Sequence, residues 1–194
     1  MGNTGSMTSA DELNEQYDAD GSVTQVPERN DEVHAGESAV AQSRESAVTI
    51  PAGTVVLAAT PIGNVGDASA RLVALLERAD IVAAEDTRRL YDLARRLGVY
   101  VNGRVIAYHD HNERDKADGL LDQVETGATV LVVSDAGMPT INDPGLAIVR
   151  RAIERGLPVT CAPGPSAVLD ALALSGLPTD RFCYEGFLPR KHSE

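Results

Sequence analysis

The chain has 194 residues, a formal net charge of −12 and a pI near 4.7. Its length allows one domain of ordinary size, or a small domain with a tail. No stretch approaches the roughly 20 apolar residues needed to cross a bilayer, and the acidic start of the chain resembles neither a secretion signal nor an organellar transit peptide, so we expect a soluble, cytoplasmic protein without a membrane partner.

Residues 1–48 differ in composition from the rest of the chain. They hold ten acidic side chains against two arginines, which accounts for −8 of the net charge of −12. Their few apolar residues are scattered and follow no period, so this segment cannot bury enough apolar surface to offset the entropy lost on ordering. We therefore predict a disordered acidic tail over residues 1–48 and a folded domain over residues 49–194.

From Thr54 onward, short apolar runs alternate with helical patterns. The predicted strands are 54–60, 80–84, 104–108, 129–133 and 158–161. The helices between and after them show apolar faces at Leu72, Leu75, Leu76 and Ala79; at Leu90, Leu93, Ala94 and Leu97, ending at Gly98; at Leu120, Leu121 and Val124; and at Leu146, Val149 and Ile153. A last helix ends near Gly176, and residues 182–188 are expected to be extended. Five strand–helix units with short connections predict an α/β domain with a mostly parallel sheet and helices on both faces.

In a parallel sheet, every loop that follows a strand's carboxyl end lies on the same edge. The loops at 61–67, 85–88, 109–113, 134–143 and 162–166 should therefore converge there. The two cysteines, Cys161 and Cys183, stand at no metal-ligand spacing, so we expect them to be reduced, half-buried thiols.

The segment 134–145 carries the clearest sign of a ligand site. It follows a predicted apolar strand and consists largely of small residues, which let a backbone approach a ligand closely. Asp143 is suited to the N-cap of the next helix and Pro144 to its first turn. These features predict free backbone N–H groups beside a helix N-terminus, where a carboxylate or phosphate can be held.

Two other glycine-containing loops leave alternatives open. Residues 61–67 lack the spacing of a dinucleotide fingerprint and the Lys-Ser/Thr of a P-loop. They form either a tight turn in which Asp67 caps the next helix, or a ligand contact. Likewise, Gly164-Pro165-Ser166-Ala167 is either an ordinary helix start or a second place where a ligand lies against the backbone.

Charged residues follow the other strands. Glu85 and Asp86 either belong to a helix start capped by Asp86 or Thr87, or supply a carboxylate that orients a hydroxyl or accepts its proton. His109 and His111 would share one strand face, yet no convincing third ligand exists beyond Glu113, so we expect no metal, and substrate hydrogen bonding and plain loop polarity stay open. The arginine-rich segments favour solvated faces over a nucleic-acid patch, although an acidic chain can bind RNA where such charges cluster.

Six motifs together resemble the small-subunit ribosomal RNA (cytidine) 2′-O-ribose methyltransferases of the tetrapyrrole methylase superfamily. They are ATPIGNVGD (59–67), AAEDTR (83–88), YHDHNE (108–113), SDAGMP (134–139), PGPSA (163–167) and EGFLPRK (185–191). The resemblance covers about residues 53–191, in order and at compatible spacing, so it is far more specific than any single motif.

This resemblance implies S-adenosylmethionine as methyl donor, bound between two α/β domains in a homodimer, with small-subunit ribosomal RNA or the small ribosomal subunit as partner. The cofactor contacts that it implies are Ile62, Ala136, Gly137, Met138, Ile141, Ser166 and Ala167, with Asp135 as a neighbour. Candidates for substrate orientation or proton removal are Glu85, Asp86, His109 and His111, and no base is assigned among them. The displacement at an activated methyl group requires no metal.

The sequence departs from the family pattern in two ways. Met138 replaces a Thr, which removes a hydroxyl and leaves a backbone contact possible. The chain also stops shortly after Lys191, where the family continues into a second domain. We therefore expect the donor-binding amino-terminal half of such an enzyme, with weak cofactor binding by itself. A methylase of a tetrapyrrole or another small molecule, and a non-catalytic cofactor-binding module, remain alternatives.

Overall fold

The structure is a computed structural model that describes residues 48–187. The predicted acidic tail, apart from Val48, lies outside the described residues, as do residues 188–194. Within residues 48–187, no helix is long and apolar enough to cross a membrane.

Five parallel strands form one sheet in the order β3-β2-β4-β1-β5. They are β1 (Val55–Ala58), β2 (Ile81–Ala84), β3 (Arg104–Ala107), β4 (Val130–Val133) and β5 (Val159–Ala162). The register is even, because Val130 faces both Val55 and Ile81 across the central strands. All five carboxyl ends therefore lie at one edge, as predicted. Strands β1 to β4 are one to three residues shorter than predicted, and β5 has its predicted length but begins and ends one residue later.

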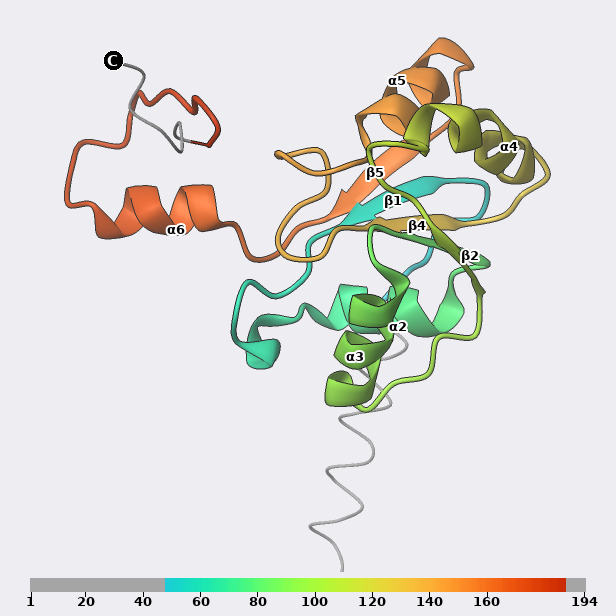
Figure 1. The fold of residues 1–194 in the computed structure, drawn as a ribbon, viewed down its shortest axis with the longest axis horizontal. Coiled ribbons are helices and arrows are strands. Elements are labelled where there is room, and N and C mark those ends of the chain that lie inside the picture. The colour runs from blue at the N-terminus through green and yellow to red at the C-terminus, as the bar shows by residue number, and fades with distance from the viewer. Residues whose placement is uncertain (1–47, 188–194) are drawn as a thin grey trace, which may run out of the picture. The chain divides into compact units, whose positions relative to one another are not determined.

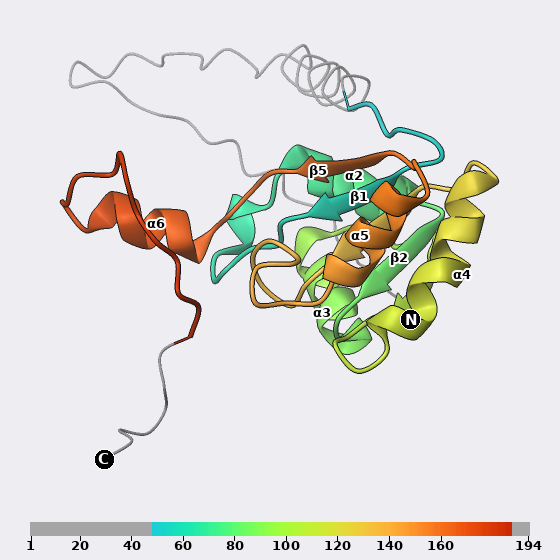
Figure 2. The same ribbon diagram turned by 90° about the horizontal axis from the view of Figure 1, so that it is seen from above.

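Helices cover both faces of the sheet, which confirms the predicted α/β class (Figures 1 and 2). Helices α2 (Ala70–Arg78) and α3 (Thr87–Leu97) cover one face, and α4 (Glu113–Glu125) and α5 (Leu146–Glu154) cover the other. The short 3₁₀ helix η1 (Val65–Asp67) and α6 (Ala167–Leu174) bury no residue. Side chains alternate between faces along a strand, so β4 sends Leu131 to the core under α2 and α3 and Val132 to the core under α4 and α5.

Helix ends set by local sequence agree only partly with prediction. Asp86 caps α3 by accepting a hydrogen bond from Arg88 N at 2.9 Å, and Gly98 ends that helix in the left-handed conformation, both as expected. Asp67, however, lies inside η1 and does not cap α2. Ser69 does so, because its hydroxyl accepts from Leu72 N at 3.0 Å.

The predicted apolar face of α5 is wrong. Leu146 and Ile153 are 47% and 68% exposed, whereas Ile148 and Ala152 are fully buried. Both sets of residues have helical spacing. The buried pair includes a small alanine, which lets the helix lie close to its neighbours, and the sheet and α4 together decide which stripe faces inward.

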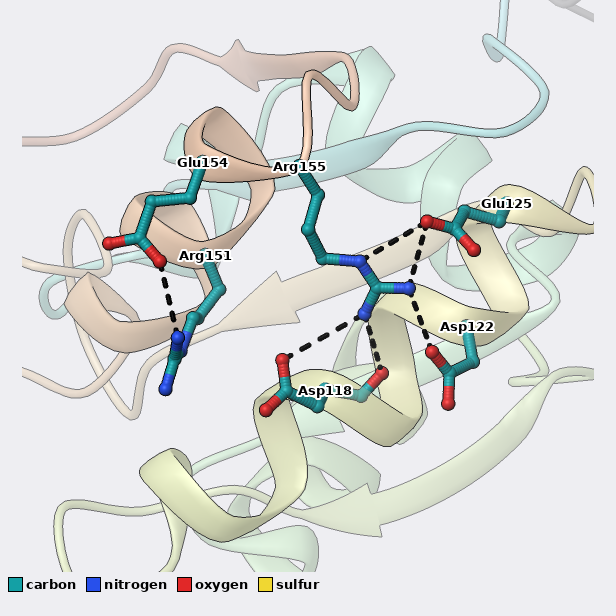
Figure 3. A network of polar contacts seen from close by, with 6 residues as sticks. All are labelled: Asp118, Asp122, Glu125, Arg151, Glu154 and Arg155. Carbon is teal, nitrogen blue, oxygen red and sulfur yellow. Dashed lines mark hydrogen bonds and ion pairs between the residues drawn. The ribbon is translucent and has the colours of Figure 1, made fainter.

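Arg155 joins the carboxyl end of α5 to α4 (Figure 3). Its guanidinium contacts the carboxylates of Asp122 and Glu125, each at 2.8 Å, and donates to the backbone oxygen of Asp118 at 3.2 Å. The hydrogen bonds to these two carboxylates raise the pKa of Arg155. This arginine is therefore engaged between two helices, rather than placed on a purely solvated face.

The chain after β5 is far more exposed than the sheet. α6 has no buried residue and extends beyond β5, away from the other helices (Figures 1 and 2). Residues 182–187 form neither helix nor strand, so the expected extended segment pairs with no strand. Cys161 and Cys183 are free, but both are exposed. The prediction of half-buried thiols is therefore wrong: Cys161 lies on β5, the strand at the edge of the sheet, and Cys183 lies in the irregular segment after α6.

Candidate functional site

The strand order favours a ligand crevice beside β4, at the carboxyl ends of the strands. This strand lies between β2 and β1. The chain leaves β1 and β2 toward α2 and α3 on one face, and leaves β4 toward α5 on the other (Figure 1). Neighbouring strands whose connections depart to opposite faces open a crevice at their carboxyl ends, where ligands bind in open α/β sheets.

Backbone hydrogen bonds join the loop after β1 to the segment 134–145, hereafter the 134–145 loop. Thr60 N donates to Gly137 O at 2.9 Å, and Gly137 N donates to Thr60 O at 3.1 Å. The Thr60 hydroxyl also donates to Ser134 O at 3.2 Å. Gly137 has a φ of 88°, a left-handed conformation that favours glycine. The predicted convergence of these two loops is therefore confirmed.

Two glutamates hold the ends of the 134–145 loop. At its start, Asp135 N donates to Glu85 Oε2 at 3.0 Å. At its end, Gly145 N donates to Glu113 Oε2 at 2.8 Å, and Ala147 N approaches the same oxygen at 3.4 Å. The N–H groups predicted to be free beside this helix are thus taken by a carboxylate of the protein itself.

The same contact corrects the predicted start of α5. Gly145, not Asp143, is the N-cap residue, and the helix begins at Leu146 instead of Pro144. Glu113 reaches across from α4 and satisfies the first donors, so the segment before α5 supplies no side-chain cap. Asp143 lies instead among other carboxylates. Burial, and the charges of Asp135 and Asp110, raise its pKa, which the Ser134 hydroxyl partly lowers.

The middle of the 134–145 loop is strained. Thr140 has a φ of 76° and Asn142 a φ of 61°. Positive φ is unfavourable for residues with a Cβ and especially for a β-branched one. Such strain collects at ligand sites, where the surrounding structure holds it in place. Asn142 also hydrogen-bonds to the Tyr184 hydroxyl, so the chain after α6 touches this loop.

The two acidic candidates, Glu85 and Asp86, differ in the direction in which their pKa is shifted. Burial is the main cause of the raised pKa of Glu85, and the charges of Asp135, Asp143 and Asp110 add to it, while the hydrogen bond from Asp135 N lowers it. Asp86 caps α3 and pairs with Arg88, and the hydrogen bonds to Arg88 lower its pKa to about 2. Glu85 is therefore the better proton acceptor of the two, and Asp86 serves the helix start.

The two histidines lie in the turn after β3 and not on a strand face as predicted. Their rings stand edge to face with centroids 6.0 Å apart. His109 Nε2 is 2.9 Å from Asn112 Nδ2, and its buried Nδ1 has no partner among the described residues. No group of three or more metal-ligand side chains exists within residues 48–187.

Most of the expected cofactor residues lie in the loop at 61–67 or in the 134–145 loop, which follow the carboxyl ends of β1 and β4. Ile62, Ala136 and Ile141 are exposed, and Met138 is half-buried. A Cβ added to Gly137 would meet Ile62 Cγ2 at 3.6 Å, so the loop at 61–67 lies directly against the 134–145 loop. Besides burial, the charges of Asp135, Asp143 and Asp110 raise the pKa of Glu85, so four carboxylates gather at this edge of the sheet.

The structure brings the residues before Ser166 and Ala167 close to the end of β1, but, within the part of the chain that it describes, it does not join these two residues to the 134–145 loop. Gly164 packs so closely on Ala59, the residue after β1, that an added Cβ would lie 3.0 Å from Ala59 Cβ. The chain then turns away, and no hydrogen bond among the described residues joins Ser166 or Ala167 to the 134–145 loop. Ser166 is the N-cap residue of α6, without a side-chain cap bond.

A groove of about 170 Å³ adjoins the crevice. Its lining includes Pro61 and Gly63 of the loop at 61–67, Arg89 and Arg96 of α3, and Asp135. Arg89 and Asp135 form an ion pair at 3.2 Å. The sequence did not single out Arg89 or the anchoring role of Glu113, and it predicted a helix cap at Asp143 instead of a place among the carboxylates at this edge. Only the position of Glu113 in the motif YHDHNE hinted at its importance.

The chain is similar to a known protein family and to named relatives over most of its length. The family model described as tetrapyrrole (corrin/porphyrin) methylases matches residues 54–194. Relatives called ribosomal RNA small subunit methyltransferase I are 55% identical over 139 residues in Mycobacterium bovis, 48% over 139 in Escherichia coli O157:H7 and 43% over 145 in Vibrio cholerae. These matches cover 72%, 72% and 74% of this chain, and 49%, 48% and 50% of the relatives. The chain thus spans about half the length of the curated relatives it matches, and it belongs to the tetrapyrrole (corrin/porphyrin) methylase family.

Proposed function

We propose that this chain is the donor-binding domain of an S-adenosylmethionine-dependent methyltransferase that acts on the 2′-oxygen of a cytidine ribose in small-subunit ribosomal RNA. The observation that carries the proposal is the joined, strained 134–145 loop at the acidic edge of the sheet. The identity to proteins called ribosomal RNA small subunit methyltransferase I supports the RNA substrate over a tetrapyrrole.

The residues at the crevice fit this donor. When bound, S-adenosylmethionine supplies a methyl group activated by a positively charged sulfur. The carboxylates of Glu85, Asp135 and Asp143 favour a positive charge at this edge. In this proposal Ile62, Gly137 and Ile141, with Ala136 and Met138, form the wall against which the donor lies. Ser166 and Ala167, at the start of α6, would contact the donor only from the margin of this wall. No metal is needed.

For proton removal we propose Glu85. One of its oxygens is fixed by Asp135 N, which orients the carboxylate at the edge of the sheet. Its raised pKa makes it a better acceptor of the ribose hydroxyl proton than an ordinary carboxylate. His109 and His111, which follow the neighbouring strand β3, orient the substrate in this proposal.

The opposite wall of the donor site belongs, we propose, to a second domain of a longer, homodimeric protein that works in the cytoplasm. The coverage of only half of each relative supports this view, as do the exposed apolar residues after β5. Leu169, Leu174 and Phe187 are 56%, 87% and 84% exposed. Residues 1–194 alone should therefore bind the donor weakly and transfer methyl groups poorly.

The test uses methyl-labelled S-adenosylmethionine with unmethylated small ribosomal subunits or with a porphyrinoid. We expect label on the RNA, recovered as 2′-O-methylcytidine after digestion to nucleosides. Label on the porphyrinoid alone would overturn the proposed substrate and favour a small-molecule methylase. Donor binding without transfer by the longer protein would favour a non-catalytic module, and full activity of residues 1–194 would contradict the need for a second domain.

A further inference from the structure

The outer face of α3 concentrates basic and aromatic side chains. At 100° per residue, Tyr91, Arg95, Arg88, Asp92, Arg96 and Arg89 follow one another within an arc of about 160°. The opposite side of the helix holds Leu90 and Ala94, which are buried. The exposed face of α3 thus carries four arginines against one aspartate, in a chain whose net charge is −12.

These arginines are accessible to a ligand. The side chains of Arg88, Arg89 and Arg95 are 89%, 68% and 79% exposed. Arg88 and Arg95 pair with Asp86 and Asp92 on the same helix. Exposed ion pairs of this kind contribute little to stability, so a phosphate can replace the aspartate as partner at little cost.

Two tyrosines stand beside the basic residues. Tyr91 is 54% exposed and Tyr100, just past the end of α3, is 82% exposed. Together with Arg95 and Val99 they line a groove of about 400 Å³. Exposed tyrosines in an open groove next to arginines provide a surface on which unpaired bases stack while the arginines contact phosphates.

The other flank of the same helix borders the candidate donor site. Arg89 and Arg96 line the groove of about 170 Å³ that also includes Gly63 and Asp135. A strand that crosses the exposed face of α3 therefore runs from the tyrosine groove to the edge where methyl transfer is proposed. An acidic protein partner would account for the arginines, but it would not explain why the tyrosine groove and the candidate donor site lie on two flanks of the same helix.

We propose that the exposed face of α3, together with Tyr100, binds a single-stranded RNA segment next to the target nucleotide. The proposal rests on the proposed function and adds the place where the substrate lies. A single strand is required because its bases can turn outward and stack on side chains, whereas those of a duplex are paired.

The test measures binding of a fluorescent single-stranded RNA oligonucleotide to the full chain by anisotropy over a series of salt concentrations. Tyr100→Ala should weaken binding about tenfold, as expected for one lost stacking contact. Arg95→Gln should weaken it by a smaller factor and reduce the slope of log K against log salt by about 0.7, one phosphate contact. The matched control is Arg151→Gln, because Arg151 forms the same type of i, i+3 ion pair on α5. That variant should bind like wild type.

The Tyr100→Ala and Arg95→Gln variants should leave donor binding unchanged, because neither residue lines the groove of about 170 Å³ beside the candidate donor site. Wild-type affinity and salt slope in both variants would overturn the proposal, as would a wild-type protein that binds no RNA. A change in oligomeric state with Tyr100→Ala, measured by sedimentation, without a change in RNA affinity would assign this face to a protein contact and also overturn it. If RNA is methylated while the variants bind normally, only this inference fails; if a porphyrinoid is the sole acceptor, the proposed function fails.

Discussion

Replacing Glu113 by alanine tests how the 134–145 loop is held. The substitution removes the acceptor at 2.8 Å from Gly145 N and leaves the first donors of α5 without a side-chain partner. Loss of a helix cap costs about 0.5–2 kcal/mol, and a hydrogen bond to a charged group contributes about 1.5–3 kcal/mol. Because the Glu113 side chain is only partly buried, we expect a loss of about 2 kcal/mol in the free energy of unfolding.

Two further variants separate the hydrogen bond from the charge. Glu113→Gln keeps an acceptor and loses the charge, so it should cost about half as much, roughly 1 kcal/mol. Asp115 lies in the same first turn of α4 and is exposed. Asp115→Ala therefore removes an equivalent charge from α4 without touching α5, and should cost less than about 0.5 kcal/mol.

Urea denaturation followed by circular dichroism measures these differences at pH 7. The order of stability should be wild type, Asp115→Ala, Glu113→Gln and Glu113→Ala. Donor affinity, measured by calorimetry on the longer protein, should fall in the Glu113 variants because the far end of the loop is released. Equal stability of Glu113→Ala and Asp115→Ala would refute the anchoring role.

Three other predictions concern the same loop and its neighbours. Thr140→Gly should raise the free energy of unfolding by about 1 kcal/mol, because it relieves a positive φ; a loss in the same denaturation assay would show that the Thr140 side chain is needed. The folded-state pKa of Asp143 is raised above 3.8, so its favourable contribution is present below that pH and is lost as pH rises through the folded pKa. Asp143→Asn should therefore be more stable than wild type at pH 7, with a difference that vanishes at low pH, and a constant difference in pH-dependent denaturation would contradict this. Gly164→Val should weaken donor binding in calorimetry, because even a Cβ there would stand 3.0 Å from Ala59 Cβ. An unchanged donor affinity would show that the loop at 162–166 is not part of the donor site.

Features decided by neighbours in the sequence could be predicted. Asp86 as cap and Gly98 as the end of α3 follow from local backbone preferences. The alternation of apolar runs and helical patterns was enough to predict a parallel sheet, and hence one edge for the loops. The strands end where the apolar runs end, within one or two residues.

Features decided by distant contacts could not be predicted. The start of α5 depends on Glu113, which lies 32 residues before Gly145 in the sequence. The buried face of α5 depends on packing against the sheet and α4. Glu85 holds Asp135 across 50 residues. In each case several residues had suitable chemistry, and only the fold selects the pair that meets. Asp143 was accordingly mistaken for a cap, although it belongs to the carboxylates of the crevice.

The most direct test of the proposed function is the amount of 2′-O-methylcytidine in small-subunit ribosomal RNA from cells that lack this gene, measured by mass spectrometry of nucleosides. We expect that one modified cytidine disappears in these cells and returns when the gene is restored. An unchanged amount of 2′-O-methylcytidine would contradict the assignment of ribosomal RNA as the substrate.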